Sequence, residues 1–451
     1  MLTSMMAASL FAASCAAPRT GTDALPDTTT METDFGSAVG LGDPVVPWAG
    51  NPGYDVSRYD WGLRFDPTTG TLSGTDRITA TALQDKGSVS LDYTGPAPLS
   101  IRLNGEDASF DYEPPKIQLE TDLLAGDEFE VEIVLGGSPE QTESRTGWLE
   151  DGELVYTVAV VPGDTASWIP VNDTPRDPAV FTVRIEADGG LSGIVSGTPG
   201  DTDPIIWETP IPVSEVGLAI GVFENRRADG LTWPTLTISW PRDSIAPSEQ
   251  ATDDEIAAAL PFLESFLGPF PFPTLGLTKI GALRGGNSTP GQIFLGVFDR
   301  LTVTHELAHQ WIGGSVGSFD SSDSWWREGI PEYLALAWIA TQDRGDDLTS
   351  TMREMYDQLG PTTRALRDVT ERGDRGDRAT YMRGALSIHA MHVAMGDDAF
   401  RKGLAGFAVG FRGRSASTED LITAMQRHTD VALAALLPPW IDEEGLPPFP
   451  G

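Results

Sequence analysis

One short motif constrains this chain more than any other feature. Residues 305–309 read His-Glu-Leu-Ala-His, and Glu328 follows after eighteen intervening residues. Two histidines four positions apart on an α-helix leave the same face one turn apart, so both can bind one Zn²⁺ ion. A carboxylate from a second helix would complete three protein ligands and leave the fourth position to water. The spacing therefore predicts a zinc hydrolase and favours a peptidase. One Zn²⁺ per chain would be held by His305, His309 and Glu328, with Glu306 as general base.

The flanking sequence favours this interpretation over a helix that carries two unrelated polar residues. Apolar residues around the motif supply enough surface to bury the helix, so its histidines would enter an interior and need a partner there. The segment 325–334 opens a second apolar helix that carries Glu328. The apolar residues of the first helix are Leu301, Val303, Leu307, Ala308, Trp311 and Ile312.

Three segments together resemble the M1 family of gluzincin aminopeptidases. The segments 305–311 and 326–329 are similar to the family's HExxH-x18-E motif, and Trp168–Pro175 is similar to its Trp-Phe-Pro-x-Asn-Asp-x-Pro motif. Tyr381-Met382-Arg383-Gly384-Ala385 resembles its Tyr-x-Lys-Gly-Ala segment, with arginine in place of lysine. In the family this tyrosine binds the oxyanion of the tetrahedral intermediate, so the resemblance implies that role for Tyr381. The resemblance to the family covers most of residues 54–449.

Alternating apolar residues between about residues 54 and 240 predict antiparallel sheet, and a helical period follows residue 243. With the resemblance, this predicts an α+β protein. A saddle-like antiparallel β-domain would occupy residues 46–243, and a mostly helical, thermolysin-like zinc peptidase domain would occupy residues 244–451. The resemblance is to a short, bacterial-type member that lacks the family's C-terminal helical domain.

One departure from the family bears on substrate choice. The family carries Gly-Ala-Met-Glu-Asn before the zinc helix, and its Glu binds the free α-amine of the substrate. Here residues 281–288 read Gly-Ala-Leu-Arg-Gly-Gly-Asn-Ser, with no Glu between Glu264 and Glu306. Whether Arg284 or Gly286 takes the anchor position, the carboxylate is missing, and arginine would repel an ammonium group. The candidate substrate-binding residues are Ala282, Leu283, Arg284, Gly285, Gly286 and Asn287.

Three other motifs have structural alternatives. Glu332, one turn after Glu328, could hydrogen-bond a zinc ligand or be a solvated carboxylate, and the Glu-x-x-x-Glu pattern that recurs in the family favours the first. The segment 313–317 fits the Gly-x-Ser-x-Gly elbow of serine hydrolases, but it follows a helix and is better explained as that helix's C-cap. His389 and His392 could share a metal, although no nearby acid completes the site and a structural role is favoured.

Composition limits the partners of this chain. The net charge is −36 and the sequence pI is about 4.3. So acidic a surface repels nucleic acid and anionic lipid, which leaves a peptide substrate as the expected partner and excludes nucleic acid. The acidity is typical of exported proteins, and salt adaptation of the host is a weaker explanation.

The N-terminus predicts export. An apolar run at residues 5–14 precedes Cys15, the chain's one cysteine, as in a lipoprotein signal peptide that is cleaved before an acylated cysteine. The residues before the run lack Lys and Arg, and Ala12 stands where Leu is usual, so the match is imperfect. An ordinary secretory signal, in which Cys15 is incidental, is the alternative. We expect a signal peptide at residues 1–15, a flexible linker at 16–45, membrane contact only through a lipid on Cys15, and a secreted or surface-anchored product.

Three functions remain open. The first is an aminopeptidase whose amine anchor is another acid, for example one on the β-domain. The second is a zinc peptidase without a strict requirement for a free N-terminus. The third is a surface lipoprotein that binds without catalysis, which the presence of Glu306 and Tyr381 disfavours.

Overall fold

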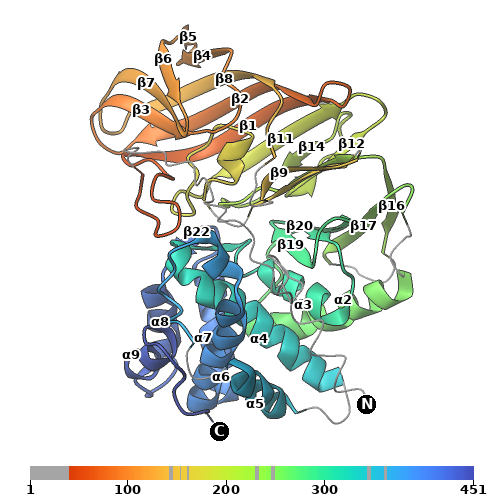
Figure 1. Cartoon of the computed structure of the whole chain (residues 1–451), viewed down its shortest axis with the longest axis vertical. Helices are drawn as coiled ribbons and strands as arrows, with labels where there is room; N and C mark the ends of the chain where they lie inside the picture. Colours follow the sequence, from red (N-terminus) through yellow and green to blue (C-terminus); the bar gives the residue numbers. More distant parts are fainter. Residues whose placement is uncertain are drawn as a thin grey trace, which may run out of the picture.

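A computed structural model describes residues 40–450, apart from 142–145, 153, 160–161, 229–232, 245–248, 343–346 and 360–362. The predicted signal peptide, Cys15 and most of the predicted linker lie outside the described residues. Within the described part of the chain, no helix is both long enough and apolar enough to cross a membrane. The described chain has a sheet-rich N-terminal half and a mostly helical C-terminal half (Figure 1), which confirms the α+β prediction.

The N-terminal half consists of three sheets. An 8-stranded sheet has the order β13-β14-β11-β1-β2-β8-β4-β5, beside a 3-stranded sheet β3-β7-β6 and a 4-stranded sheet β12-β15-β10-β9. The elements are β1 (Tyr54–Asp66), β2 (Thr71–Ala82), β3 (Lys86–Asp92), β4 (Ser100–Leu103), β5 (Glu106–Asp107), β6 (Phe110–Glu113), β7 (Lys116–Leu123), β8 (Glu128–Gly137), β9 (Gly147–Asp151), β10 (Leu154–Val158), the 3₁₀ turn η1 (Thr165–Ser167), β11 (Val180–Ala187), β12 (Ser192–Val195), β13 (Thr198–Pro199), β14 (Ile206–Glu208) and β15 (Leu218–Gly221).

The apolar residues that alternate along these strands in the sequence are buried in the core of the N-terminal half, as predicted. Trp61, Leu63 and Phe65 of β1 are buried, as are the alternate apolar residues of β8 and β11. One pairing differs from the predicted antiparallel sheet, because β1 and β11 are parallel. More than a hundred residues separate these strands, and a connection of that length allows a parallel neighbour.

The C-terminal half combines its helices with a 5-stranded sheet and a 2-stranded sheet. The elements are β16 (Phe223–Arg227), β17 (Thr235–Pro241), α2 (Glu249–Leu267), β18 (Thr274–Lys279), β19 (Gly286–Thr289), β20 (Gln292–Leu295), α3 (Arg300–His309), β21 (Val316–Ser318), η2 (Ser321–Asp323), α4 (Ser324–Gln342), α5 (Leu348–Leu359), η3 (Arg372–Gly376), η4 (Ala379–Arg383), α6 (Gly384–Met395), α7 (Asp397–Gly410), β22 (Arg414–Ala416), α8 (Thr418–Gln426), α9 (Leu433–Leu436) and α10 (Pro438–Ile441).

The predicted boundary after residue 243 cuts through a sheet. Strands β16 and β17, assigned from sequence to the β-domain, belong to a 5-stranded sheet of order β16-β17-β18-β20-β19. Leu236 and Ile238 of β17 pack in the core that contains α3 and α4. The two halves therefore meet between β15 and β16. Alternation identifies a strand but not its partner, which is why sequence placed this boundary too late.

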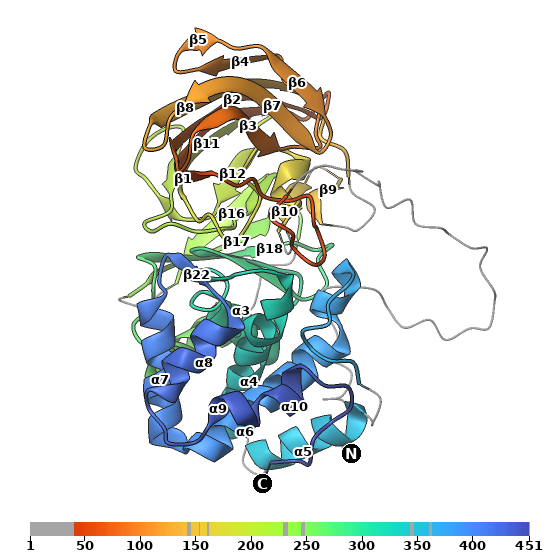
Figure 2. The same ribbon diagram turned by 90° about the vertical axis from the view of Figure 1, so that its left-hand side faces the viewer.

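The start of the described chain joins the two halves, and Figure 2 shows it, in red, running along their boundary. Asp43 is buried and accepts hydrogen bonds from the backbone and hydroxyl of Ser321. Arg176 donates to the carbonyl of Leu41 and pairs with Asp320 at 3.2 Å. Residues 40–45, predicted to belong to a flexible linker, are thus held in place by contacts to both halves.

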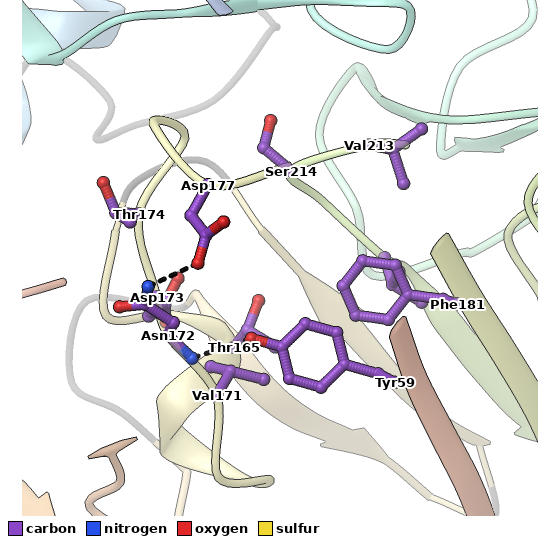
Figure 3. A pocket seen from close by; sticks show the side chains of 11 residues that line it. Tyr59, Thr165, Val171, Asn172, Asp173, Thr174, Asp177, Phe181, Val213 and Ser214 are labelled. Carbon is purple, nitrogen blue, oxygen red and sulfur yellow. Dashed lines mark hydrogen bonds between the residues drawn. The ribbon is translucent and has the colours of Figure 1, made fainter. Parts of the chain in front are cut away.

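The segment Trp168–Pro175 packs mainly inside the N-terminal half and touches the C-terminal half at its end, where the carbonyl of Pro175 accepts from the hydroxyl of Ser415. Asn172 donates from its backbone to the hydroxyl of Tyr59 and from its side chain to Asp177, at 2.9 and 2.6 Å, and these groups line the pocket in Figure 3. The neighbouring Asp173 is buried and accepts from the backbone of Ala166 at 2.8 Å. Its carboxyl faces protein interior rather than water.

Burial raises the pKa of Asp173 to about 8, although the Ala166 hydrogen bond acts in the opposite direction. Between pH 4 and 8 the folded chain holds a proton that the unfolded chain releases, so this group's stabilisation is complete below pH 4 and is lost as pH rises to 8. Asp173→Asn keeps an oxygen acceptor and cannot ionise. We expect it to gain stability relative to wild type from pH 5 to pH 8, by up to about 4 kcal/mol. Urea unfolding at both pH values measures this difference, and a constant difference would contradict a raised pKa.

Candidate metal centre

Helix α3 presents both histidines of the motif on one face. Its N-terminus is capped by Asp299, whose side chain accepts from the backbone of Thr302 at 2.9 Å. Over the next two turns the helix is buried, and the rings of His305 and His309 lie 4.7 Å apart between centroids. Their Nε2 atoms are 3.0 Å apart, so the helical period brings both donors to one point as the sequence predicts.

Helix α4 packs against α3 and brings Glu328 to the same point. Its Oε2 lies 3.2 Å from Nε2 of His309 and 3.5 Å from Nε2 of His305. Ligands about 2.0–2.1 Å from a tetrahedral zinc ion are separated from one another by roughly 3.3 Å. The three donor atoms fit that separation, and within the described residues theirs is the group of histidine and acidic side chains that could hold a metal ion.

The opposite ring nitrogens fix which atoms can bind the metal. Nδ1 of His309 lies 2.8 Å from the carbonyl of Ile312, which can only accept, so Nδ1 carries the proton. Nδ1 of His305 lies 3.0 Å from Oε2 of Glu332. On both rings Nε2 is therefore the atom that can bind a metal, once it has lost any proton. The structure places Glu332 where the sequence predicts it, against a metal ligand.

The charges at this point attract a cation. Burial alone would lower the pKa of His305, but hydrogen bonds to Glu328 and Glu332 raise it to about 10. Burial opposes ionisation of Glu328 as well, yet His309 and His305 hold its pKa well below the usual range. The carboxylates thus outweigh desolvation and stabilise positive charge among them, as expected of a site for a divalent cation.

Tyr381 reaches the site because two backbones touch. A Cβ on Gly329 of α4 would lie 2.5 Å from the backbone of Gly384, so these glycines allow α4 and the start of α6 to cross in direct contact. The preceding π-helical turn η4 brings the ring of Tyr381 to 5.6 Å from that of His305. Burial and the carboxylates of Glu328 and Glu306 raise the pKa of Tyr381 well above its usual value. Its hydroxyl therefore stays protonated and can donate.

Arg383, where the family has lysine, has a structural explanation. Its side chain is fully buried and donates to five backbone carbonyls. A lysine has three donors and no fork, so it could not hold all five. These acceptors belong to Thr363, Arg364, Pro439, Trp440 and Glu443.

Glu306 sits between the metal ligands and strand β19. A Cβ on Gly286 would lie 2.4–2.5 Å from Glu306's side chain, so the absence of a side chain at Gly286 makes room for the carboxylate. Burial raises the pKa of Glu306, while His309 and His305 lower it. The pocket around it is lined by Ala159, Gly286, Asn287, Ser288, Glu306, His309, Arg327, Glu328 and Tyr381.

The candidate substrate-binding segment contributes only its end to this pocket. Gly286 and Asn287 line it, whereas Ala282, Leu283, Arg284 and Gly285 are absent from its lining. The loop turns away because the backbone of Gly296 donates to Gly285 at 2.8 Å, and Ala282 and Leu283 pack against the β-half core. Arg284 is exposed, so it does not supply a charge at the anchor position.

Sequence reasoning missed an ion pair between a pocket residue, Arg327, and a residue of the neighbouring cavity, Glu215. Arg327 precedes the ligand Glu328 and is buried, and its Nη2 donates to Oε1 of Glu215 at 2.6 Å. A charged residue inside an apolar helix next to a predicted ligand was the signal for Arg327. Glu215, in a loop before β15, carried no motif.

The two remaining motifs have structural roles. The segment 313–317 connects α3 to β21, so it lacks the strand-to-helix turn that a serine nucleophile elbow requires. His392 lies 2.7 Å from the hydroxyl of Tyr333 and 3.1 Å from Asp397, and His389 lies 3.5 Å from the same hydroxyl. Neither histidine lines the pocket around Glu306.

Glu332→Gln should weaken zinc binding about 10- to 100-fold, because a neutral amide accepts more weakly from His305 Nδ1 and leaves that ring less basic. Competition against a fluorescent chelator measures the change. Glu354→Gln, an exposed glutamate on α5, is the matched control. Equal zinc affinity in both variants would show that Glu332 does not act on the metal ligand.

Comparison with known proteins agrees with this geometry. A family model described as the peptidase family M1 domain matches residues 299–440. A leucyl aminopeptidase of Saccharolobus solfataricus is 23% identical over 436 residues, which cover 87% of this chain and 54% of that protein. Aminopeptidase M1-A of Oryza sativa subsp. japonica is 23% identical over 321 residues, or 63% of this chain and 36% of that protein. The chain thus spans roughly a third to a half of these relatives' length.

Solved structures are similar over nearly the whole described chain. An M1 zinc metallopeptidase from Deinococcus radiodurans superposes with a TM-score of 0.81 at 28% identity, covering 91% of this chain and 99% of that one. A two-domain M1 zinc metallopeptidase mutant bound to L-tryptophan gives the same TM-score and identity over 91% and 100%. Similarity to these zinc metallopeptidases therefore accounts together for the fold, the converging metal donors and the order of the sequence motifs.

Proposed function

We propose that the chain is a member of the M1 family of zinc metallopeptidases and that it acts as an aminopeptidase, removing residues from the free N-terminus of peptides outside the cytoplasm. The observation that carries this proposal is one pocket. It combines three converging metal donors, the buried Glu306 and the protonated hydroxyl of Tyr381. A purely binding protein has no use for the last two.

Each group has a role in hydrolysis. When bound to His305, His309 and Glu328, zinc supplies Lewis-acid polarisation of the scissile carbonyl and lowers the pKa of a water. Glu306 accepts the proton of the attacking water and returns it to the leaving amine. Tyr381 donates a hydrogen bond to the developing oxyanion.

Strand β19 is suited to hold an extended peptide across this pocket. It is the edge strand of its sheet and pairs with β20 on one side. Its residues Gly286, Asn287 and Ser288 line the pocket. Backbone groups at a free sheet edge can pair with a substrate strand, whatever its side chains. The scissile bond would then lie beside Glu306.

A second candidate function is a zinc peptidase that accepts blocked N-termini. Gly286 favours it, because the position nearest Glu306 on β19 has no side chain with which to hold an amine. Unless another acid replaces that contact, an acetylated peptide would bind as well as a free one.

Mass-spectrometric mapping of one peptide, with a free and with an acetylated N-terminus, tests these functions. Loss of single residues from the free peptide, suppressed by a chelator, is the result expected of an aminopeptidase. Chelator-sensitive cleavage of both forms would support the second function. No cleavage of either peptide by the zinc-loaded protein would refute both.

We also propose that the protein is exported and held at the cell surface by a lipid on Cys15. The apolar run at residues 5–14 directly before this cysteine supports the proposal. Metabolic labelling with palmitate, compared between the wild type and Cys15→Ser, tests it. Unlabelled wild-type protein in the culture medium would indicate secretion without an anchor.

A further inference from the structure

Two buried acceptor atoms beside the metal pocket lack a donor. Oε2 of Glu215 and Oδ1 of Asn287 are both buried without a hydrogen-bond partner among the described residues. Buried polar atoms in folded proteins are almost always paired, so two such acceptors near one site point to a ligand or to water. The ring nitrogens of His305 and His309 bond to other groups and donate to neither atom.

Ala159 connects these two acceptors. It lines the metal pocket together with Asn287, whose Nδ2 donates to the carbonyl of Ala159 at 3.4 Å. It also lines a neighbouring cavity together with Glu215, Asp173 and Arg375. A group that extends from the scissile position along Ala159 would therefore pass from one acceptor toward the other.

Arg327 determines which oxygen of Glu215 is available. Its Nη2 holds Oε1 at 2.6 Å, which leaves Oε2 to the cavity. Arg375 lines the other side of the cavity, with Nη1 also unpaired, so a water bridging it to Glu215 is the simplest alternative occupant.

An ammonium group is the ligand that matches two acceptors. It has three donors and no acceptor, and it gains most from an ionised oxygen in a buried site. We propose that Glu215 is the anchor for the free α-amine of the substrate, with Asn287 as a second, neutral acceptor. This inference rests on the proposed aminopeptidase function. Glu215, from the N-terminal half, would then supply the carboxylate that β19 lacks at Gly286. The two halves would build the amine site together.

The test compares kcat/KM for one peptide with a free and with an acetylated N-terminus. Glu215→Gln should lower kcat/KM for the free peptide about 10- to 100-fold, as expected for one lost hydrogen bond to a charged group, and leave the acetylated peptide unchanged. Glu208→Gln, the same substitution at an exposed site on β14, is the control and should change neither value.

A double variant separates amine binding from support of Arg327. Glu215→Gln leaves the guanidinium without its carboxylate, so zinc content and melting temperature are measured alongside activity. In Glu215→Gln/Arg327→Gln both charges are gone. If Glu215 only neutralises Arg327, the double variant regains the preference for a free N-terminus and the proposal fails. If Glu215 binds the amine, that preference stays lost.

Other outcomes are equally decisive. Equal losses on both peptides, or no loss on either, would mean that the cavity beside Glu215 holds water only. Wild-type cleavage of both peptides at equal rates would overturn the amine site and leave a zinc peptidase, whereas no cleavage by the zinc-loaded wild type would overturn the proposed function itself. If Glu215→Gln does not fold, Asn287→Ala serves instead, and an unchanged KM for the free peptide would overturn the proposal.

Discussion

Glu306→Gln should lower kcat by at least about 10²–10⁴-fold while the protein still binds one zinc ion, because glutamine keeps the shape of the side chain but cannot accept the proton of the attacking water. The side chain is buried against Gly286, and its own contacts to β19 would survive the substitution. Steady-state kinetics together with metal analysis of the same sample measure both quantities.

The control for this variant is Glu354→Gln, which changes the same atoms on an exposed part of α5. It should retain wild-type kcat. Substantial turnover by Glu306→Gln with zinc bound would mean that another group accepts the proton. Loss of zinc from Glu306→Gln would instead place the carboxylate among the ligands, which the converging atoms of His305, His309 and Glu328 do not require.

Tyr381→Phe should lower kcat by about 10²–10³ with zinc retained and KM little changed, the usual effect of removing one oxyanion donor. The substitution deletes only the hydroxyl, so the packing of the ring 5.6 Å from that of His305 remains. Because Tyr381 would act on the transition state rather than on the bound substrate, the effect should fall on kcat.

Tyr356→Phe provides the matched control. Tyr356 is on α5, and its hydroxyl donates to the carbonyl of Pro447 away from the metal pocket. It should leave kcat unchanged at a small cost in stability. An unchanged kcat in Tyr381→Phe as well would remove Tyr381 from the mechanism, whereas a raised KM alone would assign it to substrate binding.

The metal donors could be predicted from the sequence because their geometry is local. Helical periodicity places His305 and His309 on one face, and the spacing to the next helix predicts Glu328 as the third donor, which the structure places 3.2 Å from His309. Tyr381 could not be derived in that way. It reaches the pocket through the contact of Gly329 with Gly384, and only the family resemblance indicates its role from the sequence.

Long-range contacts account for what the sequence did not reveal. Glu215 and Arg327 are 112 residues apart, and neither belongs to a motif that predicts the pairing. The same holds for Asp43, which reaches Ser321 from a segment that composition assigned to a linker. Strand β17 was recognised as a strand, but its parallel partner β18 lies beyond the boundary that its pattern suggested.

The residue at the amine-anchor position could not be identified from the sequence either. The sequence offers Arg284 or Gly286 for the anchor position, but Arg284 is exposed, and the arginine that lines the metal pocket is Arg327. Loop residues between β18 and β19 fold back onto Gly296, a turn that no periodicity describes. The spacing of the motif residues therefore predicts the metal site of this chain better than it predicts which substrates the pocket accepts.

Zinc reconstitution tests the central claim most directly. Protein stripped with a chelator is titrated with Zn²⁺, and bound metal and peptide hydrolysis are followed in the same sample, with His309→Ala as control. We predict that hydrolysis returns in proportion to bound zinc, is complete at one ion per chain, and does not return in the control. Hydrolysis that survives stripping, or its absence from wild type carrying one zinc ion, would contradict the account.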